Sequence, residues 1–302
     1  MSPDFCYCLE KLIHFNKFRN VYRIYLNSRN YFTSYPLSYL STMYSKTNLQ
    51  NPWEWGIPAV ALILFGLIIV TNSNVAVFLA INSLHHITGN GLWANLTIIG
   101  DTLVIFSLVF PLIKRYPSIV WAAIISGVLG GLWVHIMKSV FESNRPAAEL
   151  ALDTFNIIGP LLKYFSFPSG HTTSAFALAA VIALYTPYLG LRLGVVFIAI
   201  LAGLARIVVG AHWPVDVLGG MFGGWLAGVF GVLLAQRWKW GTSLKAQRMT
   251  GLILCLCPLL LLFQHNTHYP QALPLQYTIG IVSLIVGGYH LWRLFFPPNP
   301  AL

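Results

Sequence analysis

Long apolar stretches alternate with short polar segments along most of the chain. Six strong stretches cover about 56–72, 94–113, 117–137, 170–187, 191–209 and 216–235, and two more follow at about 249–264 and 275–295. A helix needs about 20 apolar residues, or about 17 at the short end, to cross the hydrocarbon core of a bilayer. The pattern therefore predicts an all-α, polytopic membrane helix bundle, in which the seventh stretch is the shortest.

The composition supports a membrane protein. Of the 302 residues, 57% are hydrophobic and only 9% are charged, whereas soluble domains carry about 25% charged residues. The net charge of +10 would suggest a nucleic-acid partner in a soluble protein. Here the basic residues lie between apolar stretches, where membrane topology and anionic lipid headgroups explain them better. We therefore predict the lipid bilayer as partner and no nucleic acid.

Lys and Arg favour the cytoplasmic side of a membrane. They occur at 11–46, at 114–115, at 192 and at 237–248, and they are absent from 72–93 and 264–274. This alternation predicts that both termini are cytoplasmic. The exceptions, which fall on the outer side, are Lys138, Arg145, Lys163 and Arg206.

We divide the chain into a cytoplasmic tail (1–50), a six-span core (51–240) and two additional C-terminal spans (241–302). The tail has no continuous apolar segment, so it is neither a signal peptide nor a span. It is either an aromatic and basic segment on the inner membrane surface or a loosely ordered extension. The sequence does not indicate an oligomeric state.

The first segment with chemical potential is Lys138-x6-Arg145-Pro146. If the third helix continues that far, both cations project from one face, because seven residues make about two turns. Pro146 then ends the helix. Two cations at this spacing suit phosphate oxygens, although a snorkelling pair at a helix end is the simpler interpretation of this segment alone.

The second segment is Pro168-Ser169-Gly170-His171, which precedes an apolar helix. Ser169 is a good N-cap residue, and Gly170 allows a close approach to the backbone. The free N–H groups at a helix start favour an anion. His171 would then stand in the first turn, beside the bound anion.

The third segment is Arg206-x5-His212-x3-Asp216. Pro214 suits the first position of the next helix, which puts Asp216 near the third. His212 and Asp216 are four residues apart and can meet across one turn. A carboxylate on one imidazole nitrogen fixes the tautomer and leaves the other nitrogen available for attack. The alternative is a capping aspartate beside an interfacial histidine.

These three segments together resemble the type 2 phosphatidic acid phosphatase superfamily, which includes bacterial lipid phosphatases and vanadium haloperoxidases. The resemblance covers about 90–236. It implies that His212 is the nucleophile, that Asp216 orients it and that His171 is the acid and base. It also implies that the substrate phosphate is bound by Lys138, Arg145, Ser169, Gly170 and Arg206. One position departs from the pattern: Ala205 stands where the family has a serine.

From this resemblance we expect a lipid phosphatase without metal or cofactor, acting through a phosphohistidine at the outer face of a bacterial inner membrane. Its substrate would be a lipid monophosphate or diphosphate, such as undecaprenyl diphosphate, phosphatidylglycerol phosphate, phosphatidic acid or a lipid A phosphate. Two alternatives are a phosphotransferase between lipids and a lipid transporter with a degenerate site.

Other polar residues have structural interpretations. Asp101, in the second stretch, is expected near the outer interface and bonded to a neighbour, and His135 is expected to be packed. Glu142, Glu149 and Asp153 are expected in a solvated loop, and His265 and His268 in a loop without metal. In Cys6-x-Cys8 and Cys255-x-Cys257 the spacing is too short for a usual zinc site, so Cys255 and Cys257 are expected to be small apolar fillers.

Overall fold

The computed structural model describes residues 52–264 and 267–297, and in these ranges all regular structure is helical, with no strand. The predicted all-α class is confirmed. The tail at 1–50, Cys6, Cys8 and His265 lie outside the described residues, and the predicted division of the chain at residue 240 stays a prediction.

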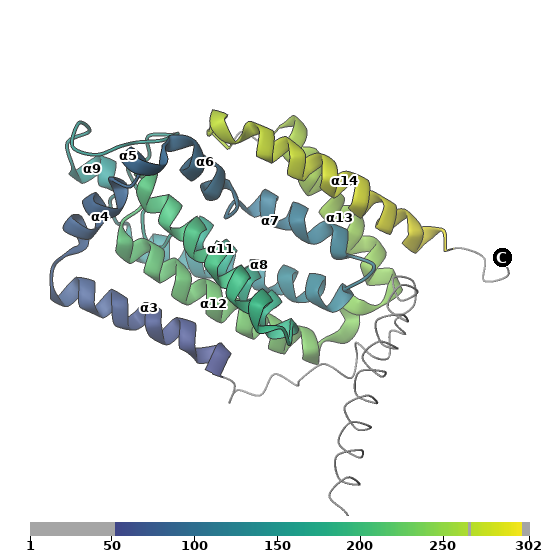
Figure 1. Cartoon of the computed structure of the whole chain (residues 1–302). Coiled ribbons are helices and arrows are strands. Elements are labelled where there is room, and N and C mark those ends of the chain that lie inside the picture. Colours follow the sequence, from purple (N-terminus) through teal and green to yellow (C-terminus); the bar gives the residue numbers. More distant parts are fainter. Residues whose placement is uncertain (1–51, 265–266, 298–302) are drawn as a thin grey trace, which may run out of the picture. The chain divides into compact units, whose positions relative to one another are not determined.

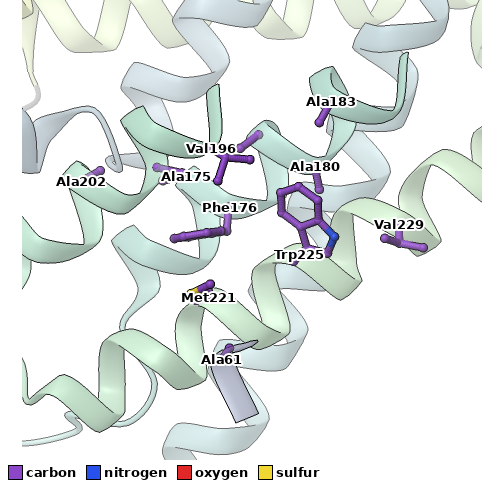
Figure 2. Packing of buried hydrophobic residues seen from close by; sticks show 12 residues of the cluster. Ala61, Ala175, Phe176, Ala180, Ala183, Val196, Ala202, Met221, Trp225 and Val229 are labelled. Carbon is purple, nitrogen blue, oxygen red and sulfur yellow. The ribbon is translucent and has the colours of Figure 1, made fainter. Parts of the chain in front are cut away.

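Helix α12 (Pro214–Arg237) lies at the centre and packs against α8 (Pro117–Phe141), α10 (Gly170–Tyr185) and α3 (Pro52–Val70), while α11 (Leu189–Val208) packs against α10 (Figure 1). Glycine permits a close approach of α12 to α10: a Cβ at Gly224 would lie 2.3 Å from the carbonyl oxygen of Thr173. Trp225 is completely buried between α12 and its neighbours, beside Phe176 and Met221 (Figure 2). Small residues therefore set the spacing of the core helices, and one large ring fills the space between them.

Six of the predicted spans are helices long and apolar enough to cross a membrane. They are Pro52–Val70, Pro117–Glu149 (α8 counted together with the short helix at 146–149), Leu189–Val208, Pro214–Arg237, Leu244–Phe263 and Pro270–Phe295 (the last helix counted with the short helix before it). Helix α10, predicted as the fourth span, has only 16 residues. Its neighbours on three sides bury most of it, so it is an internal helix whose first residue lies at the candidate site described below.

The second predicted span is broken. Helices α6 (Asn90–Ile98) and α7 (Thr102–Val109) meet at an angle of 63° when α7 is taken with η2 (Phe110–Leu112). Gly100, in the break, packs against His171 so closely that a Cβ would lie 2.6 Å from the His171 carbonyl oxygen. Asp101 caps α7 by accepting from the N–H groups of Leu103 (2.9 Å) and Val104 (3.3 Å). The stretch predicted at about 94–113 is thus a bent pair of helices, and the bonded state expected for Asp101 is confirmed.

The two C-terminal helices, α13 (Leu244–Phe263) and α14 (Leu273–Phe295), pack against each other and against α7. The Ser283 hydroxyl donates to the carbonyl of Ser107. The short helix η3 (Lys239–Thr242) connects α12 to α13, and η4 (Pro270–Ala272) precedes α14. The C-terminal pair is thus joined to the broken second span.

Short helices and loops gather at one end of the core helices. They include α4 (Asn74–Asn82), α5 (His85–Thr88) and α9 (Pro146–Glu149). The Asn82 amide donates to the carbonyls of Asn156 (2.9 Å), Ile207 (3.2 Å) and Val208 (2.9 Å). Buried backbone acceptors in the connections are satisfied in this way, and the connection after α9 is held against the end of α11.

Candidate active site

The ends of four core helices lie close together. These are the last residues of α8 and α11 and the first residues of α10 and α12. The helix ends and the connections beside them carry the residues predicted from sequence: Lys138, Arg145, Ser169, Gly170, His171, Arg206, His212 and Asp216. The fold therefore brings the three sequence segments to one end of the bundle.

His212 and Asp216 meet as their spacing predicts. Pro214 is the first residue of α12, and the Asp216 carboxylate accepts from the N–H of Trp213 (2.8 Å). Its Oδ2 lies 3.4 Å from Nδ1 of His212 and also accepts from the Ser166 hydroxyl. Both residues of the pair are buried, His212 at 2% and Asp216 at 1% exposure. Asp216 thus caps the helix and holds the imidazole at the same time.

Arg145 fixes the tautomer of His212. One terminal nitrogen of Arg145 lies 3.2 Å from Nε2 of His212 and donates to the Ala211 carbonyl at 2.9 Å. A guanidinium can only donate hydrogen bonds, so Nε2 must be the acceptor and carries the lone pair. The proton therefore sits on Nδ1, facing Asp216.

The backbone path to Arg145 differs from the prediction. Helix α8 ends at Phe141, Glu142 is left-handed with φ 40°, and Arg145 is extended. Pro146 begins α9 and does not end α8. The condition under which Lys138 and Arg145 would share one helix face is therefore not met, because α8 ends before Arg145.

The two cations still converge, on one carbonyl. The oxygen of Phe165 accepts from Nζ of Lys138 (2.7 Å) and from a terminal nitrogen of Arg145 (3.3 Å), while Nε of Arg145 donates to the Tyr164 carbonyl at 2.8 Å. Phe165 adopts a left-handed backbone with φ 55°, which is rare for a bulky residue. This conformation directs a carbonyl at both cations.

The second segment forms the predicted helix start. Ser169 is the N-cap of α10, and its hydroxyl accepts from the Thr172 N–H at 3.4 Å and from the Thr172 hydroxyl at 2.9 Å. Gly170 and His171 are the first two helical residues. The N–H of Ser169 donates to the Asp216 carbonyl at 3.0 Å, which ties the starts of α10 and α12 together.

Arg206 is held by two hydroxyls that the sequence motifs do not contain. One terminal nitrogen donates to Thr97 Oγ1 (2.6 Å) and to the Tyr269 hydroxyl (2.9 Å). Sequence reasoning missed Thr97, Tyr269 and Ser166, because each comes from outside the three motifs. Their polar character inside or beside apolar stretches was the available signal.

Burial and neighbouring positive charges both lower the pKa of His212. Burial, and then the positive charges of Arg145, Arg206 and Lys138, lower the pKa of His212 well below its ordinary value of 6.5. The imidazole is therefore neutral at neutral pH and has an unprotonated nitrogen.

A cavity of about 440 Å³ opens beside the site, between α7, α8 and α10. Lys138 and His171 line one end of it, and Gly127, Gly130 and Gly131 line its wall on α8. His135 lies on the same wall and is exposed, so the packing expected for it was wrong. The cavity therefore extends from the end lined by Lys138 and His171 into a region lined by apolar side chains and glycines.

The remaining polar candidates are peripheral. Glu142, Glu149 and Asp153 are exposed, as expected for a solvated loop, and His268 lies between α13 and η4. Cys255 and Cys257 are partly buried in α13. In the part of the chain that the structure describes, no group of three or more His, Cys, Asp or Glu side chains is arranged to hold a metal ion.

Comparison with known proteins gives concordant matches. Residues 117–240 match the model of the PAP2 superfamily. An undecaprenyl-diphosphatase of Sulfolobus acidocaldarius is 31% identical over 163 residues, covering 51% of this chain and 75% of that protein. A lipid A 1-phosphatase of Rhizobium etli is 35% identical over 114 residues, covering 36% of this chain.

The match spans about half the length, 47%, of the Rhizobium protein. Among solved structures, LpxE of Aquifex aeolicus has a TM-score of 0.48 and 29% identity, covering 55% of this chain and 95% of that one. The extent of the match to the Sulfolobus protein, together with the family model, decides the family. The chain belongs to the PAP2 superfamily.

Proposed function

We propose that the chain is an integral-membrane lipid phosphatase that works through a phosphohistidine at His212. The observation that carries this proposal is the state of His212: neutral, oriented by Asp216 through Nδ1, with the Nε2 lone pair among cations. A neutral imidazole nitrogen beside Arg145, Lys138 and Arg206 suits attack on a dianionic phosphate, because the cations offset the charge of the phosphoryl oxygens.

In the first step, Nε2 of His212 attacks phosphorus and the bond from phosphorus to the lipid oxygen breaks. His171 donates a proton to that leaving oxygen. Asp216 stabilises the positive charge that develops on the imidazole. Lys138, Arg145 and Arg206 hold the transferring phosphoryl group, with Ser169 and the N–H of Gly170 completing the cradle.

In the second step, water attacks the phosphohistidine. His171, now neutral, takes a proton from that water, the bond from phosphorus to nitrogen breaks, and phosphate leaves. By taking this proton His171 returns to its protonated starting state, ready to protonate the next leaving group. The scheme requires no metal, since guanidinium and ammonium groups supply the positive charge.

The cavity between α7, α8 and α10 suits the hydrocarbon part of such a substrate. On α8 its lining residues recur every three or four positions from Ala123 to Lys138, which is one face of a helix about 22 Å long. A lipid chain lying along this face would hold its phosphate near Lys138 and His171. The substrate would reach the site sideways from the bilayer.

The names of two relatives support a substrate class. The Rhizobium and Sulfolobus proteins are named for lipid A 1-phosphate and undecaprenyl diphosphate. Both substrates are phosphorylated lipids, and we propose that this chain acts on a lipid phosphate of that kind. We further propose that the site faces the periplasmic or extracellular side of a bacterial inner membrane, as the charge distribution indicates.

The test is phosphate release by the purified chain in detergent with EDTA, from undecaprenyl diphosphate, lipid A, phosphatidic acid and phosphatidylglycerol phosphate. We expect release from at least one lipid, and loss of release in His212→Ala. Full activity in that variant, or complete loss of wild-type activity in EDTA, would contradict the mechanism. Appearance of phosphate on a second lipid would identify a transferase.

A further inference from the structure

Arg206 has an unusual set of partners for a buried cation. It is 3% exposed, and its hydrogen bonds go to two neutral hydroxyls, those of Thr97 and Tyr269. Within 52–264 and 267–297 no carboxylate lies at ion-pair distance from it. Neutral partners orient a guanidinium without neutralising it, so its full charge stays available for an anion.

Nε of Arg206 supports this interpretation. It is buried and has no hydrogen-bond partner among the described residues. A buried donor without a partner is unfavourable by about 1–3 kcal/mol, and more for a charged group. A phosphate oxygen at this position would satisfy it. One terminal nitrogen of the Arg206 guanidinium is therefore hydrogen-bonded to the protein, and Nε is left to donate to a ligand.

Tyr269 is held rigidly at this place. Its side chain is 3% exposed and belongs to a buried cluster with Ala205, Ala211 and Ala272. Gly159, which has φ +84°, lies so close to the ring that a Cβ there would be 2.6 Å from Cε1 of Tyr269. The ring therefore has little freedom, and the position of its hydroxyl is determined by packing.

The connection that carries Tyr269 is also anchored. The Thr267 hydroxyl donates to Oε1 of Gln276 (2.9 Å), and the Gln276 amide donates to the Leu261 carbonyl (2.7 Å). The Tyr269 carbonyl accepts from the N–H of Ala272 at 2.9 Å. These bonds anchor residues 267–272 to α13 and α14, two helices that lie outside the region matched by the family model.

We propose that Tyr269 is a positioning residue for phosphate binding, and that the two C-terminal helices complete the site by supplying it. The Tyr269 hydroxyl holds one nitrogen of Arg206 so that Nε faces the phosphate, and Thr97 provides the second contact. A hydroxyl 63 residues away in sequence thus lies beside Arg206, in a chain that has Ala205 where the family pattern has serine. This inference rests on the proposed function, because it assigns the anion at Arg206 to the substrate phosphate.

The test is equilibrium binding of orthovanadate, a phosphate analogue, to the purified full chain and to Tyr269→Phe. This variant keeps the ring and loses only the hydroxyl. We expect the dissociation constant for vanadate to rise about tenfold, as expected for a lost hydrogen bond to a charged group. The variant should stay folded, with a thermal midpoint lowered only as far as the loss of one buried hydrogen bond requires. Tyr277→Phe, at an exposed tyrosine on α14, is the matched control and should bind as the wild type does.

A double-mutant cycle separates positioning from general packing. Lys has no planar fork, so Tyr269→Phe should have no further effect on vanadate binding in an Arg206→Lys background. Thr97→Val gives a second variant and should weaken vanadate binding in the same direction. Unchanged binding in Tyr269→Phe, or effects that multiply in the double variant, would overturn the inference.

Different results would contradict the proposed phosphatase function and the role proposed for Tyr269. If the wild-type chain binds vanadate but releases phosphate from no lipid, the proposed function is contradicted. The double-mutant cycle of Tyr269→Phe and Arg206→Lys on vanadate binding still tests the role of Tyr269. If the wild-type chain hydrolyses a lipid phosphate and Tyr269→Phe binds vanadate and turns over as the wild type does, only the inference fails.

Discussion

Nε2 of His212 lies 3.2 Å from a nitrogen of Arg145 that can only donate. At the scale of single residues, this contact sets the tautomer, and Asp216 and Ser166 hold the opposite edge of the ring. Arg145 itself is fixed by the carbonyls of Tyr164, Phe165 and Ala211. In the proposed mechanism, its fork would serve both as a phosphate clamp and as an orienting group for the nucleophile.

Replacing Arg145 with lysine keeps the charge and removes the fork, so several of these contacts are lost together. We expect kcat to fall roughly 10²-fold, the size of effect seen when one transition-state donor is removed. Steady-state phosphate release measures it. Arg192→Lys is the matched control, since Arg192 lies at the start of α11, away from the site, and donates to the Thr186 carbonyl. Equal activity of Arg145→Lys and the wild type would contradict the assigned role.

His212 should also make stability depend on pH. Its pKa is lower in the folded chain than the 6.5 of the unfolded chain, so protons favour unfolding as the pH falls below 6.5. This contribution is fully present above pH 6.5 and is lost progressively as the pH falls below that value.

His212→Asn lacks the titrating ring, so its thermal midpoint in detergent should fall less than that of the wild type between pH 7 and pH 5. Parallel decreases in the two proteins would show that His212 is not buried as a neutral group.

At the scale of helices, glycine positions on α8 decide what the cavity can hold. A Cβ at Gly131 meets nothing within 4 Å, although Gly131 lines the cavity. A larger side chain there would enter the cavity without disturbing the packing of the helix. The cavity wall can therefore be altered separately from the fold.

Gly131→Leu should reduce hydrolysis of long-chain lipid phosphates about tenfold or more, while hydrolysis of the small substrate p-nitrophenyl phosphate stays near the wild-type value. Gly66→Leu on α3, where a Cβ also meets nothing, is the control outside the cavity. The measurement is kcat/KM for both substrates. An equal reduction for both substrates, or none for either, would mean that the cavity does not bind the lipid chain.

The helices also show where sequence reasoning reaches its limit. Hydropathy predicts that residues near 94–113 are apolar, but it does not reveal the bend at Gly100, which follows from the contact with His171. The helix starts marked by Ser169 and Pro214 were predictable because the start of a helix depends on adjacent residues. The turn between Phe141 and Arg145 was not, since it is set by contacts with the 163–166 segment.

At the scale of the whole molecule, the motif residues were predictable because each motif is local in sequence. Thr97 and Tyr269 were not, as they meet Arg206 across 109 and 63 residues. Contacts of this kind depend on the complete bundle, including the C-terminal helices. The chain's distribution of charge, in contrast, is visible in both sequence and structure.

The end of the bundle opposite the site carries Lys114, Arg115, Arg192, Arg237, Lys239, Lys245, Arg248 and Arg293. Such a concentration favours the cytoplasmic side. In a chain freed of its four native cysteines, a cysteine at Asp153 should react with an impermeant maleimide in intact bacteria. A cysteine at Lys239 should react only after the cells are opened. The reverse pattern would place the site on the cytoplasmic side.

The most direct test of the central claim is to trap the phosphoenzyme. p-Nitrophenyl phosphate has a leaving group that needs no proton, so His171→Ala should pass the first step and stall at the second. We predict that this variant accumulates a phosphoryl group that is stable in alkali, is lost in acid and maps by mass spectrometry to His212. A phosphoryl group on another residue, or steady turnover of this substrate by His212→Ala, would contradict the account.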